Sequence, residues 1–133
     1  MRAQLEAITQ ALAHEIETTG AIELDGQIYR KNSLNPSPSA GFCRPAVDKF
    51  ASLFKETNPQ SRVTRISITT VGDTIWERSR HVLAEVETPE DIHYVDPTID
   101  QFGKYQRVYS RKETYPIEHY PNSVTRTIIH DGL

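Results

Sequence analysis

Three side chains of this 133-residue chain have the right types for acyl-transfer chemistry: Cys43, His81 and Asp96. In such chemistry a thiolate attacks a carbonyl carbon, an imidazole carries the proton, and a carboxylate fixes the imidazole tautomer and supports its positive charge. Cys43 is the only cysteine, so it has no partner for an internal disulfide and cannot by itself anchor a thiolate zinc site. It is therefore either a small buried apolar residue or a reactive thiol.

The surroundings of Cys43 favour a reactive thiol. It follows a polar loop over 32–40 (NSLNPSPSA) and directly precedes an expected amphipathic helix over 44–56. Unpaired N–H groups and the dipole at a helix N-terminus stabilise a thiolate, and Arg44 adds positive charge. A structural cysteine would be expected inside the apolar stripe of the helix, whereas Cys43 comes before that stripe.

His81 and Asp96 lie on two expected strands that are joined by a turn over 88–91 (TPED). If the strands form a hairpin in which Glu87 pairs with Glu90, His81 lies directly opposite Asp96. Side chains that face each other across such strands have Cβ atoms about 4.5–5.5 Å apart, so an imidazole and a carboxylate there can hydrogen-bond. The spacing therefore predicts a His81–Asp96 pair, provided that this register holds.

Hydrophobic patterns elsewhere predict the elements that would position these residues. Apolar residues spaced three and four apart indicate helices, and Gly20 and the Asp25-Gly26 pair are suited to a helix end and a tight turn. The expected elements are helices over 2–18 and 44–56, a hairpin over 21–29, and strands over 62–71, 81–87, 92–96 and 124–129. This order favours a single α+β domain over 1–133 with an antiparallel sheet.

The composition is that of an ordinary globular domain and indicates no charged or lipid partner. Apolar residues make up 37%, charged residues 25%, and the net charge is -3, so we expect neither a nucleic-acid nor a membrane partner. The basic, tyrosine-rich stretch 104–115 is more simply a solvated face. No run approaches the roughly 18 apolar residues that span a bilayer, and the acidic start of the chain does not resemble a signal peptide. We therefore expect a cytoplasmic protein, with leaderless export left open.

Three short stretches resemble the motifs of transglutaminase-like proteins. The stretch 41–44 (GFCR) before an apolar helix resembles the nucleophile motif, 81–86 (HVLAEV) is similar to the histidine strand, and 94–98 (YVDPT) is similar to the aspartate strand, where Asp-Pro-Thr is characteristic. The resemblance covers about 32–102 and leaves 103–133 as a C-terminal segment. It implies a papain-like fold in which the cysteine heads a helix packed on an antiparallel sheet that carries the histidine and the aspartate.

The resemblance also implies a role for each member of the triad. Cys43 would be the nucleophile, His81 the general base and acid, and Asp96 the residue that orients the imidazole. Members of the family cross-link or deamidate protein glutamines, hydrolyse amides or cleave peptides, so a protein or peptide amide substrate and a thioester intermediate are expected. No metal or organic cofactor is needed. The alternative is a non-catalytic binding or structural module of the same fold, in which drift would be expected to spoil at least one member of the triad.

Three further residues are weaker candidates for the site. Asn35 is a candidate oxyanion donor, since the family often has a Gln or Trp upstream of the cysteine. Trp76, the only tryptophan, either packs at the edge of the core or forms a wall of the acyl site. Gln101 follows the aspartate strand and either contacts the site or caps a turn. His93 is expected to face the other side of its strand, and Val82 stands where the family often has an aromatic residue.

Overall fold

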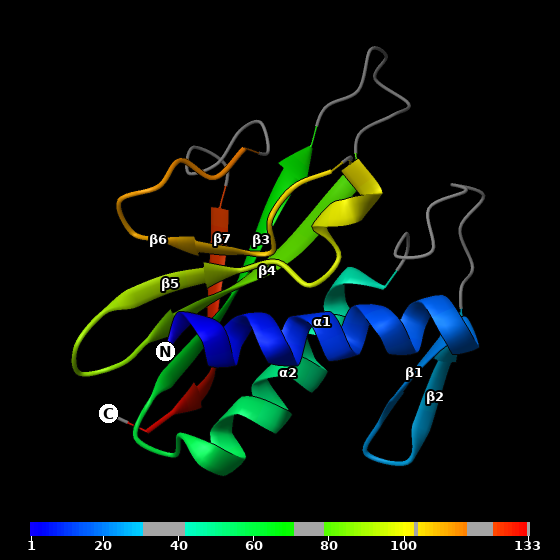
Figure 1. Cartoon of the computed structure of the whole chain (residues 1–133), viewed down its shortest axis with the longest axis horizontal. Coiled ribbons are helices and arrows are strands. Elements are labelled where there is room, and N and C mark those ends of the chain that lie inside the picture. The colour runs from blue at the N-terminus through cyan, green and yellow to red at the C-terminus, as the bar shows by residue number, and fades with distance from the viewer. Residues whose placement is uncertain (31–41, 71–78, 103, 117–123, 133) are drawn as a thin grey trace.

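The computed structural model has an α+β architecture (Figure 1), as the order of the expected elements predicts. It describes residues 1–30, 42–70, 79–102, 104–116 and 124–132. The elements formed by these residues are α1 (Arg2–Thr19), β1 (Ala21–Leu24), β2 (Gln27–Arg30), α2 (Cys43–Thr57), β3 (Arg62–Thr70), β4 (Ser79–Glu87), β5 (Ile92–Val95), the 3-10 helix η2 (Ile99–Phe102), β6 (Val108–Ser110) and β7 (Val124–Asp131). Within this part of the chain, five strands form one antiparallel sheet in the order β6-β5-β4-β3-β7, and β1 pairs with β2.

The first helix, α1, forms because its apolar residues fall on one face. Leu5, Leu12 and Ile16 on that face are buried. Gly20 ends the helix with a φ of 66°, a left-handed conformation that costs glycine little, and its N–H donates to the carbonyl of Ile16 over 2.9 Å. The expected helix and its glycine end are thus confirmed. No helix in the described part of the chain is both long enough and apolar enough to cross a membrane.

The hairpin of β1 and β2 supports the start of α2. Asp25 and Gly26 both have positive φ, 50° and 82°, as a two-residue turn that matches the twist of the strands requires. Ile22 of β1 is fully buried in a cluster with Phe42 and Ala46, which flank the first turn of α2. The expected hairpin is therefore confirmed, and its apolar contact helps to determine where α2 begins.

The second helix, α2, begins at Cys43, one residue before the expected start. Pro45 lies in its first turn, where a missing N–H removes no helical hydrogen bond. On the side of the helix, Asp48 accepts a hydrogen bond from Arg65 of β3 over 3.0 Å, which ties the helix to the sheet. The predicted apolar stripe is buried and consists of Val47, Phe50, Ala51 and Phe54.

Both faces of the main sheet carry buried apolar residues. The helix-side cluster packs the sheet against α1 and α2, as Figure 1 shows, and its strand residues are Val63, Val82, Ala84, Val86, Val95 and Val108. The tyrosine cluster lies on the opposite face, because residues that alternate along a strand point to opposite sides, and its members are Ile66, Ile68, Leu83, Ile99, Tyr109 and Tyr115. The chain that follows β5 therefore folds back over the face that α1 and α2 leave uncovered.

The sequence patterns predict neither η2 nor β6. β6 has three residues, too few to show an alternation, and it is identified by its antiparallel pairing with β5, which runs from Val108 opposite Val95 to Ser110 opposite His93. β7 extends past the expected end at residue 129 and pairs with β3. Asp96 follows β5 directly instead of ending the strand.

The register of the β4–β5 hairpin differs from the predicted one by two residues. Glu87 pairs with Ile92, not with Glu90. The reason is the size of the turn: the N–H of Thr88 donates to the carbonyl of Asp91 over 2.9 Å, and the N–H of Asp91 donates to Thr88 Oγ1 over 3.2 Å. These bonds close a four-residue turn, whereas the predicted pairing allows only two residues between the strands.

Candidate active site

The candidate site lies where α2 and β4 begin and where β5 ends. Cys43 is the first residue of α2 and is half-buried, next to Phe42, which is fully buried beneath it. This position gives the thiol a helix N-terminus, the environment that stabilises a thiolate. The structure therefore places Cys43 at a helix start, as expected from the sequence, and the expected loop over 32–40 lies outside the described residues.

His81 and Asp96 form a buried pair. His81 Nε2 lies 2.6 Å from Asp96 Oδ2, and the two residues are 1% and 0% exposed. In the observed register Asp96 would lie opposite Leu83, so the prediction that Asp96 directly faces His81 is wrong. The predicted contact between the two side chains nevertheless forms. The two side chains are diagonal neighbours, and diagonal neighbours lie within reach of long side chains. An imidazole and a carboxylate thus meet despite the register shift of two residues.

The carboxylate of Asp96 is held by several donors. Oδ2 accepts a hydrogen bond from the Tyr115 hydroxyl and also contacts His81 Nε2. Oδ1 accepts from the backbone N–H of Thr98 over 3.3 Å, and the N–H of Asp96 itself donates to the carbonyl of Arg107 over 2.8 Å. A buried carboxylate with donors on both oxygens has its charge compensated and its orientation set.

The electrostatics of His81 favour an imidazolium at neutral pH. Burial lowers the pKa of His81, but the negative charge of Asp96 and its hydrogen bond outweigh burial, and Cys43 adds a smaller hydrogen bond and charge, so that the pKa is raised to about 9. Because Nε2 is occupied by Asp96, Nδ1 is the ring nitrogen left for the thiol. An imidazolium beside a thiol can favour the thiolate and can later deliver a proton to a leaving group.

The side chains of the other three predicted site residues lie outside the described residues. Asn35 and Trp76 lie outside the described residues, and Gln101 lies in η2, where its side chain is also outside them. His93 pairs with Val86 of the helix-side cluster, which puts it on the opposite face from the tyrosine cluster, as expected. Among the described residues, no three His, Cys, Asp or Glu side chains gather in a way that could hold a metal ion.

Tyr115 is the site residue that the sequence does not reveal. It belongs to the tyrosine cluster, where its ring meets that of Tyr109 edge-on with centroids 5.6 Å apart. In the sequence it is one of several tyrosines among charges after residue 103, with no periodicity to mark its face. Burial, followed by the negative charge of Asp96, raises the pKa of Tyr109, and the Tyr115 hydroxyl donates a hydrogen bond to the same carboxylate.

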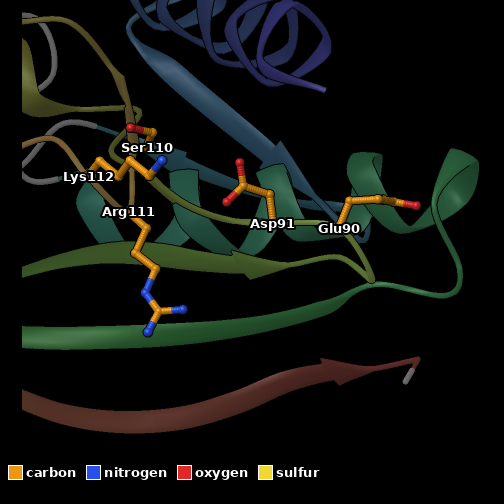
Figure 2. A pocket seen from close by; sticks show the side chains of 5 residues that line it. All are labelled: Glu90, Asp91, Ser110, Arg111 and Lys112. Carbon is orange, nitrogen blue, oxygen red and sulfur yellow. The ribbon is translucent and has the colours of Figure 1, made fainter.

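A surface cavity of about 460 Å³ lies at the other end of β5, away from Asp96. Figure 2 shows that the Glu90 and Arg111 side chains extend in different directions from Asp91, so the charged groups do not converge on one point. A binding site usually needs a few convergent polar groups. The groups of the described residues that are suited to chemistry are instead concentrated at Cys43, His81 and Asp96.

In the comparisons with known proteins, no family model, no curated protein and no solved structure matches the chain.

Proposed function

We propose that the protein is a cysteine-dependent enzyme that transfers acyl groups or hydrolyses amides, with a papain- or transglutaminase-like arrangement of its active site. The observation that carries this proposal is the continuous chain of contacts from Cys43 at the start of α2, through His81, to the buried carboxylate of Asp96. Such a chain supplies a nucleophile, a proton carrier and a residue that orients the proton carrier.

The first half of the proposed reaction forms a thioester. The Cys43 thiolate attacks the carbonyl carbon of an amide, and a new bond joins Sγ to that carbon while the negative charge moves to the carbonyl oxygen. The backbone N–H of Cys43, in the first turn of α2, is one donor available to that oxyanion. His81 then transfers its proton to the nitrogen of the leaving amine as the C–N bond breaks.

The second half of the reaction regenerates the thiolate. His81, now neutral, accepts a proton from an attacking water or amine, whose oxygen or nitrogen bonds to the thioester carbon. The C–S bond breaks, the product acid or new amide leaves, and the thiolate and the imidazolium are restored. Water as the acceptor gives a deamidase or peptidase, and an amine as the acceptor gives a transglutaminase.

The fold supports the transglutaminase-like alternative over an unrelated thiol site. The cysteine heads a helix that packs on an antiparallel sheet, the histidine lies on one strand of that sheet, and the aspartate follows the neighbouring strand. Those are the positions in which the resemblance of the three sequence motifs expects them. A protein or peptide amide is the substrate class that this proposal implies.

The test of the proposal is the reactivity of Cys43, the only thiol. In the native protein, iodoacetamide should alkylate this thiol rapidly at pH values well below the ordinary thiol pKa of about 8.5. Cys43→Ala should abolish release of ammonia or amine from glutamine-containing and amide-capped peptides while the circular dichroism spectrum stays unchanged. Slow alkylation that requires pH 8.5 or unfolding would contradict the enzyme proposal and indicate a binding module.

A further inference from the structure

Two donors converge on a single oxygen of the buried carboxylate. Both His81 Nε2 and the Tyr115 hydroxyl lie within hydrogen-bond distance of Asp96 Oδ2, and Tyr115 is only 7% exposed. A tyrosine hydroxyl in such a buried place is seldom without a specific partner, because an unpaired hydroxyl there would lose its hydrogen bonds to water without replacing them. The hydroxyl is thus positioned to act on His81 through the carboxylate that they share.

We propose that Tyr115 is a positioning residue that sets, through the shared oxygen of Asp96, how strongly His81 holds its proton. This inference rests on the proposed function, in which His81 alternately gives and takes a proton. It gives the C-terminal part of the chain a role in the chemistry, although none of the three triad motifs lies in that part.

The direction of the effect follows from charge compensation. When His81 is an imidazolium, its positive charge already stabilises Asp96; when His81 is neutral, the carboxylate depends more on its other donors. The Tyr115 hydroxyl therefore stabilises the neutral-imidazole state more than the imidazolium state. Its presence lowers the pKa of His81 below the value that Asp96 alone would impose, which eases proton transfer to the leaving amine.

The ring of Tyr115 is held in place by contacts that do not involve its hydroxyl. It packs edge-on against Tyr109 within the tyrosine cluster. The turn before it is closed by Glu113, whose N–H donates to the Ser110 carbonyl over 3.1 Å and whose Oε1 accepts from the Ser110 N–H over 2.9 Å. Arg2 of α1 also donates to Glu113. Tyr115→Phe should therefore remove the hydrogen bond and leave the packing unchanged.

The groups that face the His81–Asp96 pair come from several elements. In the described part of the chain they are the Cys43 thiol from α2 and the phenols of Tyr109 in β6 and Tyr115 after it. Tyr109 supplies a matched control, because Tyr109→Phe also deletes one hydroxyl from the same cluster. Among the described residues, Asp96 accepts a hydrogen bond from Tyr115 and none from Tyr109.

The experiment is an NMR titration of the histidine ring signals from pH 5.5 to 10.5 in the wild type, Tyr115→Phe and Tyr109→Phe, with His81→Gln used to assign the His81 signal. We expect Tyr115→Phe to raise the midpoint of the His81 titration by about 0.5–1 pH unit, since one of the donors to the carboxylate is lost. Tyr109→Phe should leave the midpoint within about 0.2 unit of the wild type, because it removes no donor to Asp96.

The possible results separate this inference from the proposed function. A wild-type midpoint that is raised above the usual value of about 6.5, together with an unchanged or lower midpoint in Tyr115→Phe, overturns the role of Tyr115 and leaves the triad intact. Equal shifts in both tyrosine variants also overturn it, because they would show a general effect of the cluster. A Cys43 that alkylates only at ordinary thiol pH contradicts the function itself, whatever the tyrosine variants do.

Discussion

An aspartate and a histidine approach each other at both ends of β5, and the two pairs differ in almost every physical respect. Asp96 follows β5 and lies 2.6 Å from His81, with both residues buried. Asp91 precedes β5, is 53% exposed at its side chain, and lies 3.8 Å from the ring of His93. The His81–Asp96 pair also interacts with the Cys43 thiol and the Tyr115 hydroxyl, whereas the Asp91–His93 pair lies beside the surface cavity of Figure 2.

The comparison shows that burial of a histidine does not by itself make a reactive site. His93 is buried, with 5% exposure, and its Nδ1 has no hydrogen-bond partner among the described residues. What distinguishes His81 is that its ring interacts with two groups of defined chemistry, the carboxylate of Asp96 and the thiol of Cys43. The carboxylate of Asp91 remains solvated, so its attraction for a histidine is screened.

The largest expected difference between the two pairs is in stability. Asp96→Ala leaves a buried imidazole and a buried tyrosine hydroxyl without their acceptor, and the free energy of unfolding should fall by about 3–5 kcal/mol. Asp91→Ala should cost less than about 1 kcal/mol, because the Asp91 carboxylate is solvated and lies 3.8 Å from the ring of His93. Urea unfolding of both variants measures this directly. If Asp96→Ala does not fold, Asp96→Asn supplies the comparison, and equal losses at the two sites would contradict the distinction.

The second largest expected effect is on the pH dependence of stability, which should report the protonation of His81. Since its pKa is raised from about 6.5 in the unfolded chain to about 9 in the fold, folding takes up a proton, and the stabilisation is fully present below pH 6.5. It should be lost as the pH rises through 9, by up to about 3 kcal/mol. Urea unfolding at intervals from pH 6 to 9.5 checks the sign.

The control for the pH experiment is the Cys43→Ala background, which removes the titration of the thiol itself. The decline should persist there, because Asp96 supplies the larger part of the raised pKa. It should disappear in His81→Gln and remain in His93→Gln. A stability that increases between pH 6.5 and 9 would contradict the assignment of His81 as an imidazolium.

The smallest of the three effects concerns the rate of thiol alkylation. His81→Gln removes the imidazolium beside Cys43, and alkylation by iodoacetamide at pH 6.5 should slow by about 10- to 100-fold, since an ordinary thiol is about 1% ionised there. His93→Gln should change the rate by less than about twofold, because the thiol interacts with His81, whereas His93 lies in β5 beside Asp91. Similar slowing in both variants would indicate a general loss of structure at the start of α2.

Much of the fold could be predicted because it depends on local patterns. The apolar spacing of α1, the left-handed positions at Gly20 and Asp25-Gly26, and the stripe of α2 each require only neighbouring residues to be recognised. The type and order of the elements then follow, and with them the α+β class. β6 escapes prediction because a three-residue strand has no measurable period, and its pairing with β5 and the burial of Val108 and Tyr109 arise only in the tertiary structure.

The sequence by itself determined which residues could do chemistry at this site: one thiol at a loop-to-helix junction, and a histidine and an aspartate on neighbouring strands. Only the tertiary structure decided that Asp96 meets His81 diagonally, because the hydrogen bonds between Thr88 and Asp91 set the length of the turn. Only the tertiary structure brought Tyr115 to the same carboxylate, since a contact across 19 residues depends on how the chain after β5 folds back over the sheet.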